Sequence, residues 1–145
     1  MITQLVYTSS ASFDPRSESG RMHVSDIIAT ARQHNGANDI TGFLIVGSDW
    51  FAQVLEGEAQ AITSLFRRIL ADRRHIHVKL VETRFVRERL FPDWAMGYSH
   101  GPMLGTPLSA ILQRSAFDSA LDFPFDRIIR HAQKQAEITR LSTDS

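Results

Sequence analysis

The pattern of apolar residues predicts a strand and then a helix in the first part of the chain. Residues 2–9 are rich in β-branched and aromatic side chains, which suits a strand. Residues 11–20 are polar and contain a proline and a glycine, which is typical of a loop. Apolar side chains then recur at positions 24, 27, 28 and 31, the spacing of an amphipathic helix. Gly36 is placed to end that helix as its C-cap.

A hairpin, a second helix and a further strand follow. Two apolar runs, residues 40–46 and 50–55, flank Gly47-Ser48-Asp49, whose residue types favour a hairpin turn. Apolar residues at helical spacing predict a second helix over residues 62–70, with its end near Asp72. Residues 78–86 alternate as a strand does.

The order strand, helix, strand, strand, helix, strand predicts the ferredoxin-like βαββαβ arrangement, an α+β fold. We expect the first and third strands to lie side by side and parallel in the middle of the sheet, because of the right-handed crossovers. An additional strand would make the sheet five-stranded, and helices would follow at the C-terminus.

The character of the chain changes after residue 100, so residues 1–100 are predicted to form one domain and residues 101–145 a helical extension. Thr106-Pro107 is a strong helix start, and Leu108, Ile111 and Leu112 form a short apolar stripe behind it. A last helix is expected from about Phe125. Two roles stay open for this extension: it covers the face of the sheet that the earlier helices leave free, or it binds a partner or a second copy of the chain.

Composition narrows the class of protein. At 145 residues the chain is about one domain long, and its 16 basic and 16 acidic residues give a formal net charge of zero. This balance gives no electrostatic case for binding nucleic acid or an anionic membrane. No apolar run approaches the roughly 20 residues that span a bilayer, so we expect a cytoplasmic protein. The chain has no cysteine, which excludes a thiolate metal site and a thiol nucleophile.

Two polar residues, Tyr7 and Gln53, occupy strand positions where an apolar residue is expected. Strand alternation puts Gln53 on the face of Phe51 and Leu55, so its amide should be largely buried. An unpaired buried amide costs about 1–3 kcal/mol, and Tyr7 is an available partner if the first and third strands are neighbours. The residues alone leave two interpretations: a hydrogen bond that only satisfies two core groups, or a functional pair.

Other polar and aromatic residues are ambiguous when each is taken alone. His34-Asn35 lies where the first helix ends, Arg68 lies in the second helix, and Trp94-Ala95-Met96 follows Phe91-Pro92. Each has an ordinary structural explanation. The run from Asp72 to His77 contains two histidines, but such residues more often close a helix end, and we predict no metal site.

Taken together and in order, these residues resemble the BLUF family, sensors of blue light using flavin, over residues 2–98. No single motif is diagnostic, whereas the ordered set is highly specific. The resemblance is carried by Leu5-Val6-Tyr7-Thr8-Ser9, Ala31-Arg32-Gln33-His34-Asn35, Ile40-Thr41-Gly42-Phe43-Leu44, Phe51-Ala52-Gln53-Val54-Leu55-Glu56-Gly57, Arg68-Ile69, Asp72-Arg73-Arg74-His75 and Phe91-Pro92-Asp93-Trp94-Ala95-Met96.

The resemblance implies a non-covalently bound flavin, usually FAD, with FMN as the alternative, held between the two helices with its ring pointing at the sheet. Asn35 suits the C4 carbonyl and N3 side of the ring, because its amide donates and accepts at once. Arg68 and His34 would supply donors to the C2 carbonyl, and Gln53 would face N5 and O4. The cofactor-binding residues implied are Tyr7, His34, Asn35, Gln53, Arg68, Asp72 and His75.

The resemblance also implies a photochemical mechanism. In the family, excitation draws an electron and a proton from the tyrosine toward the flavin through the glutamine, here Tyr7 and Gln53. The pair recombines with the glutamine side chain rotated or tautomerised, and the absorption of the flavin shifts to the red. Signal would leave through Trp94 and Met96, which in the family lie beside the glutamine. Without cysteine, a sulfur–flavin bond cannot form.

The remaining residues are too few for a catalytic domain, so we expect no enzyme activity and an output through a separate signalling protein or through self-association as a homo-oligomer. Two alternatives stay open. A small acylphosphatase-like hydrolase would need a phosphate-binding loop after the first strand, but Thr8-Ser9-Ser10-Ala11 contains no glycine. A flavin-free interaction module would keep only the fold.

Overall fold

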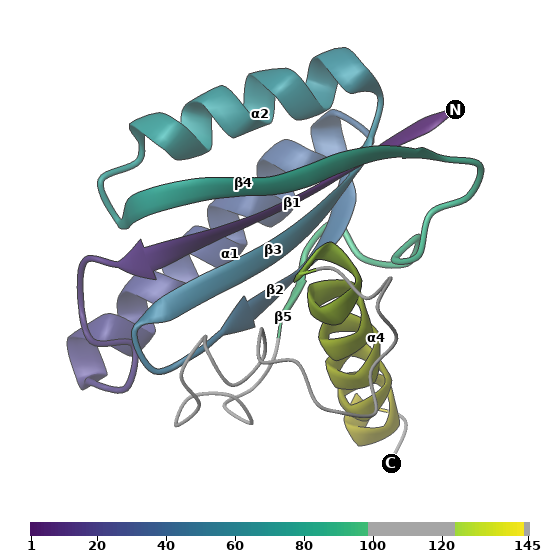
Figure 1. Ribbon diagram of the computed structural model, residues 1–145. Coiled ribbons are helices and arrows are strands. Elements are labelled where there is room, and N and C mark those ends of the chain that lie inside the picture. Colours follow the sequence, from purple (N-terminus) through teal and green to yellow (C-terminus); the bar gives the residue numbers. More distant parts are fainter. Residues whose placement is uncertain (99–123, 144–145) are drawn as a thin grey trace.

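The computed structural model describes residues 1–98 and 124–143, and in that part of the chain one five-stranded sheet is packed with three helices (Figure 1). The predicted α+β order of elements is confirmed. The elements are β1 (Ile2–Ala11), α1 (Glu18–Ala37), β2 (Thr41–Val46), β3 (Trp50–Gly57), α2 (Ala59–Ala71), β4 (His75–Val86), β5 (Gly97–Tyr98) and α4 (Pro124–Thr143).

The strands run in the order β4-β1-β3-β2-β5, so β1 and β3 are neighbours as predicted. Their expected parallel direction is wrong: they pair antiparallel, with Tyr7 opposite Gln53. The physical reason lies in the two crossovers. Each helix joins strands that are parallel but not adjacent, β1 with β2 and β3 with β4, and the two pairs interleave. Thus β3 lies between β1 and β2, and β1 lies between β4 and β3, so each crossover passes over one strand that runs the other way. Among the described strands, only β5 lies parallel to its neighbour, β2.

Strand alternation separates two hydrophobic clusters, one on each face of the sheet. On one face, Tyr7 of β1 and Phe51 and Leu55 of β3 pack with Ile27 of α1 and Ile62 of α2. We call this the helix-pair face.

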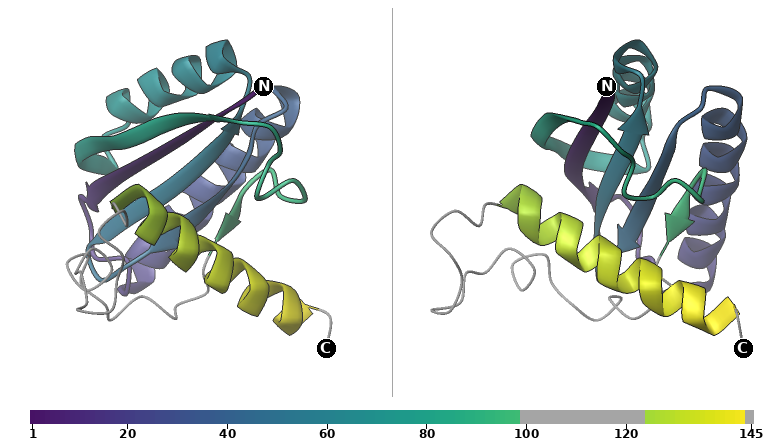
Figure 2. Two further views of the ribbon diagram at one scale, coloured as in Figure 1. Left: turned by 45° about the vertical axis from the view of Figure 1, so that its right-hand side comes forward. Right: turned by 90° about the vertical axis from the view of Figure 1, so that its right-hand side faces the viewer.

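On the other face, even-numbered residues of the same strands, such as Val6 and Val54, pack with Ile128 and Ala132 of α4. We call it the α4 face. Figure 1 shows α1 behind the sheet and α4 in front of it, and Figure 2 shows α4 crossing the strands. Arg84 of β4 forms an ion pair of 2.8 Å with Asp126 at the start of α4. The helix expected behind Thr106-Pro107 lies outside the described residues.

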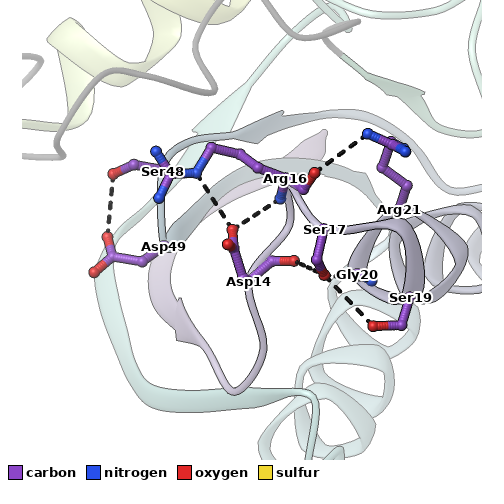
Figure 3. Close-up of polar contacts among 8 residues, drawn as sticks. All are labelled: Asp14, Arg16, Ser17, Ser19, Gly20, Arg21, Ser48 and Asp49. Carbon is purple, nitrogen blue, oxygen red and sulfur yellow. Dashed lines mark hydrogen bonds and ion pairs between the residues drawn. The ribbon is translucent and has the colours of Figure 1, made fainter.

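Helix α1 is longer at both ends than the apolar pattern predicts. It begins at Glu18, inside the expected loop, because the hydroxyl of Ser17 caps it by accepting from the N–H of Gly20 at 2.9 Å (Figure 3). The hydroxyl of Ser17 also donates to the carbonyl of Asp14 at 2.8 Å. A side chain at position 20 has no room, since a Cβ there would lie 1.7 Å from the carbonyl oxygen of Asp14.

The other end of α1 also differs from the expectation. Gly36 lies within the helix and is not its C-cap; Asn38 is. The carbonyl of Asn35 accepts from the N–H groups of Asn38 and Ile40, so the chain turns directly from α1 into β2. This turn fixes His34 and Asn35 at the edge of the helix-pair face. None of the helices within residues 1–98 and 124–143 is long and apolar enough to cross a membrane.

The packing of α4 generates a stability prediction. Ile128 is fully buried against the α4 face, so Ile128→Ala should lower the free energy of unfolding by about 2–4 kcal/mol through lost burial and a residual cavity. Urea denaturation measures this change. Ile138→Ala, at a position of the same helix that is 41% exposed, is the matched control and should cost less than about 1 kcal/mol. Equal costs for the two variants would contradict the packing of α4 on the sheet.

Candidate functional site

An open pocket lies between α1, α2 and the helix-pair face of the sheet; the atom-free space there, open solvent included, is about 660 Å³. All seven residues that the sequence analysis assigned to cofactor binding line this pocket. They are Tyr7, His34, Asn35, Gln53, Arg68, Asp72 and His75.

Six further lining residues were missed by the sequence analysis. Thr30 and Ala31 lie one turn before His34 on α1, and Leu65 and Ile69 flank Arg68 on α2. Helical spacing from His34 and Arg68 could have identified Thr30, Ala31 and Leu65, and Ile69 lies one turn after Leu65. The remaining two are Ile27, one more turn back along α1, and Arg74 after α2.

The central polar pair of the pocket is Tyr7 and Gln53, which face each other across β1 and β3. Both side chains are buried, and the hydroxyl of Tyr7 donates a hydrogen bond to Oε1 of Gln53. The amide nitrogen of Gln53 donates to the sulfur of Met96 at 3.1 Å. The amide of Gln53 therefore links the tyrosine to the segment that follows β4.

The environment of Tyr7 keeps its hydroxyl protonated. Complete burial raises the pKa of Tyr7 far above its ordinary value, and the negative charge of Asp72 adds to the rise. The ring of Tyr7 meets Phe66 and His75 in edge-on contacts with centroid distances of 5.8 and 6.1 Å. A neutral, immobilised hydroxyl of this kind acts as a hydrogen-bond donor throughout the physiological pH range.

At the end of α1, two buried polar atoms have no hydrogen-bond partner among the described residues: Oδ1 of Asn35 and Nδ1 of His34. The amide nitrogen of Asn35 is used, since it donates to the carbonyl of Ala95 at 2.8 Å. Buried polar atoms are almost always paired in proteins, so unpaired ones at a pocket wall indicate a ligand with polar groups. The edge of a flavin ring, which carries carbonyl oxygens and an N–H, fits this set of atoms.

An ion pair and a buried histidine line the part of the pocket that follows α2. The guanidinium of Arg74 contacts both carboxylate oxygens of Asp72, at 2.7 and 3.0 Å, and holds the pKa of Asp72 below its ordinary value. Nδ1 of His75 lies 2.9 Å from the hydroxyl of Ser9, and burial lowers the pKa of His75. His75 is therefore neutral near pH 7. The described residues contain no cluster of three or more potential metal ligands.

Of the two residues expected beside Gln53 in the signal path, only Met96 lies there. Met96 is buried on the helix-pair face, whereas Trp94 packs against Phe43, with ring centroids 5.6 Å apart, and belongs to the α4 face. We call residues 90–96 the crossing segment, because it passes from one face of the sheet to the other around the edge of β2. The chain bends at residues 95 and 96, and this bend separates two side chains that regular strand alternation would put on one face.

Comparison with known proteins extends these observations. The family model described as sensors of blue-light using FAD matches residues 2–97. The chain is 36% identical over 118 residues to photoactivated adenylate cyclase subunit beta of Euglena gracilis, a match that covers 79% of this chain and 13% of that protein. The chain thus spans only a small part of this much longer relative.

Two solved structures resemble the whole fold. The photo-activated state of BlsA superposes with a TM-score of 0.72 at 26% identity, covering 92% of this chain and 95% of that one. The dark-state structure of the BLUF protein BlrB superposes with a TM-score of 0.70 at 28% identity, covering 94% and 96%. The match to the family model over two thirds of the chain, together with these relatives, shows that the chain belongs to the BLUF family of blue-light sensors, whose cofactor is FAD.

Proposed function

We propose that this chain is a blue-light receptor in which Tyr7, Gln53 and Met96 form a hydrogen-bond switch at the edge of a bound FAD. The observation that carries the proposal is the continuous path of hydrogen bonds from the Tyr7 hydroxyl through the Gln53 amide to the Met96 sulfur, with Tyr7 and Gln53 in the wall of a pocket. A pair that only satisfied core groups would need no pocket beside it. In this protein Gln53 lines the pocket, and its amide also donates to a thioether.

Seven side chains would hold the cofactor. Asn35 Oδ1 would accept from the N–H of the ring, because that acceptor is buried and otherwise unpaired in the described residues. His34 and Arg68 would serve the neighbouring carbonyl, with Gln53 and Tyr7 at the sheet side of the ring. Asp72 and His75 would line the opposite end of the pocket, where Arg74 neutralises the charge of Asp72.

Bound FAD supplies the absorption of blue light and an excited state that accepts an electron from a nearby tyrosine. The protein's part is to hold a proton at Tyr7 Oη against Gln53 Oε1 until that happens. A half-turn of the Gln53 amide would then exchange its two ends: the NH₂ group would face Tyr7, and the oxygen would face Met96. The two ends have nearly the same shape but opposite hydrogen-bonding character, so the turn changes the pattern of hydrogen bonds without disturbing the packing.

Loss of the donor toward Met96 would release the thioether, the side-chain contact between Gln53 and the end of the crossing segment. This segment carries Phe91 and Trp94, which pack on the α4 face. A change at Gln53 would therefore reach the side of the sheet opposite the pocket, where α4 lies. That arrangement supports residues 1–100 as the flavin-binding domain and residues 101–145 as the extension that passes the signal on.

We infer that this chain senses light and that catalysis belongs to other proteins. Its output would go to a separate signalling protein or through association with a second copy of itself. The similarity to a subunit of a photoactivated adenylate cyclase supports a link to an effector. The similarity of its fold to BlsA and BlrB supports the assignment as a receptor. Neither the hydrolase nor the flavin-free module explains the unpaired atoms of His34 and Asn35.

The first test is the absorption spectrum of the purified protein before and after blue light. We expect a flavin spectrum that shifts reversibly to the red on illumination. The shift follows from the new hydrogen bonds that the turned Gln53 amide makes. A protein that contains no flavin and takes up no added FAD would contradict the proposed function.

Two substitutions test the switch itself. Tyr7→Phe removes only the hydroxyl that donates to Gln53, and Gln53→Leu removes the amide; both should leave FAD bound and abolish the red shift. Light-minus-dark absorption spectra of the loaded variants measure this. A normal photocycle in either variant would remove the substituted residue from the mechanism.

A third substitution tests cofactor binding at the end of α1. Asn35→Leu removes the buried acceptor and the donor to Ala95, so the affinity for FAD should fall about tenfold or more. Titration of the flavin-depleted protein with FAD, followed by quenching of flavin fluorescence, gives the dissociation constant. Gln33→Leu, two residues earlier on the exposed side of α1, is the control and should bind FAD as the wild type does.

A further inference from the structure

Glu56 is a fully buried carboxylate near the end of β3, three residues after Gln53. Its two oxygens accept three hydrogen bonds. Oε2 accepts from the amide of Gln4 at 2.9 Å and from the N–H of Leu90 at 2.8 Å, and Oε1 accepts from the N–H of Phe91 at 2.8 Å. Hydrogen bonds to a charged acceptor are about twice as strong as neutral ones, and they offset the cost of burying the charge.

Arg89 completes the attachment from the opposite direction. Its guanidinium donates to the backbone carbonyl of Glu56 at 3.0 Å, to the hydroxyl of Thr41 at 3.0 Å and to the carbonyl of Asp39 at 2.8 Å. The side chain of residue 56 thus holds the backbone of residues 90 and 91, while the side chain of residue 89 holds the backbone of residue 56. We call Glu56 and Arg89 with these contacts the Glu56 clamp.

The clamp lies at the start of the crossing segment, and Met96 lies at its end. Between them, the carbonyl of Trp94 accepts from the N–H of Gly42, and the carbonyls of Ala95 and Met96 accept from Asn35 and Arg32. The segment is therefore attached to β3 at both ends, by the side chain of Glu56 at one end and by that of Gln53 at the other. Three residues of strand, roughly 10 Å, separate these two points of attachment.

Because three is an odd number, Glu56 and Gln53 point to opposite faces of the sheet. The crossing segment has to begin on the α4 face, where Phe91 packs, and end on the helix-pair face, where Met96 packs. Its start is fixed by a buried carboxylate; at its end, Asn35 and Arg32 hold the backbone, and the amide of Gln53 contacts the side chain of Met96. The clamp therefore limits the movement of the start of the segment when the contact at Gln53 changes.

We propose that Glu56 is a positioning residue for the light switch: by binding the backbone of Leu90 and Phe91, it holds the sulfur of Met96 against the amide of Gln53. The inference rests on the proposed function of the Tyr7–Gln53–Met96 path. Glu56 acts through the backbone and touches neither the pocket nor the reacting groups. Weakening the clamp should let the segment shift and detach Met96 from Gln53 in the dark.

The test uses Glu56→Gln in the full chain loaded with FAD. The substitution keeps the shape of the side chain, but its NH₂ group must face at least one of the donors that the carboxylate accepted. The readout is the methyl signal of Met96 in a spectrum of methyl-labelled protein, recorded in the dark. The chain has four methionines, so Met96→Leu assigns the signal. We expect the Met96 signal of the variant to move and broaden.

A second readout is the thermal return of the absorption spectrum after illumination. In Glu56→Gln the weakened hydrogen bonds to Leu90 and Phe91 no longer favour the dark-state position of the crossing segment. The return should therefore slow about tenfold, the effect of roughly one charge-assisted hydrogen bond. Gln4→Leu is the matched control, because the side chain of Gln4 donates to the same carboxylate and makes no hydrogen bond to the crossing segment among the described residues. In the control the Met96 signal should stay at its wild-type position, even if the protein becomes less stable.

Two outcomes would overturn the inference: an unchanged Met96 signal in Glu56→Gln, or an equal displacement of that signal in Gln4→Leu. If Glu56→Gln does not fold, Arg89→Gln, which removes the reciprocal half of the clamp, should displace the Met96 signal in the same way, and an unchanged signal would again overturn the inference. A wild-type protein that binds FAD without a red shift would instead contradict the proposed function, since the methyl signal is read without illumination.

Discussion

The antiparallel register of β1 against β3 is the constraint on which the rest of the site depends. It sets Tyr7 opposite Gln53 and, three pairs along, Gln4 opposite Glu56. One pair faces the helices and the pocket, and the other faces the α4 side. A shift of the register by one residue would turn both pairs over and bury the wrong face of each strand. The apolar residues that alternate with them, such as Val6 and Leu55, make that shift costly, so the hydrophobic core fixes the geometry of the polar site.

Much of this arrangement could be predicted from the sequence because it depends on local periodicity. The parity of Gln53 with Phe51 and Leu55 predicted its burial and its face, and helical spacing predicted the apolar sides of α1 and α2. The predicted cofactor residues all line one pocket. They lie on strands and helices whose order along the chain was predicted correctly, and that order brings these elements together on one face of the sheet. The wrong direction of β1 relative to β3 came from treating the crossover as if it joined adjacent strands.

What the sequence could not provide depends on backbone geometry or on contacts between distant residues. The start of α1 is set by the hydroxyl of Ser17 and the tight approach at Gly20, which no apolar pattern records. Trp94 and Met96 are two residues apart, and only the bend at residues 95 and 96 puts them on opposite faces. The contacts of Glu56 with Leu90 and Phe91 span more than thirty residues. In the sequence, Glu56 is simply the polar residue that ends an apolar strand.

The two ends of the Asn35 amide differ: its nitrogen donates to the carbonyl of Ala95, and its buried oxygen has no hydrogen-bond partner among the described residues. If that oxygen accepts from the cofactor, as in the proposed function, binding of the cofactor and ordering of residues 95 and 96 are thermodynamically linked, and such linkage is reciprocal. If the bound cofactor raises the equilibrium constant for ordering this backbone by some factor, ordering of the backbone raises the affinity for the cofactor by the same factor. A partner protein that binds residues 95 and 96 more tightly in one state of the switch would, for this reason, also change the affinity of the chain for its chromophore.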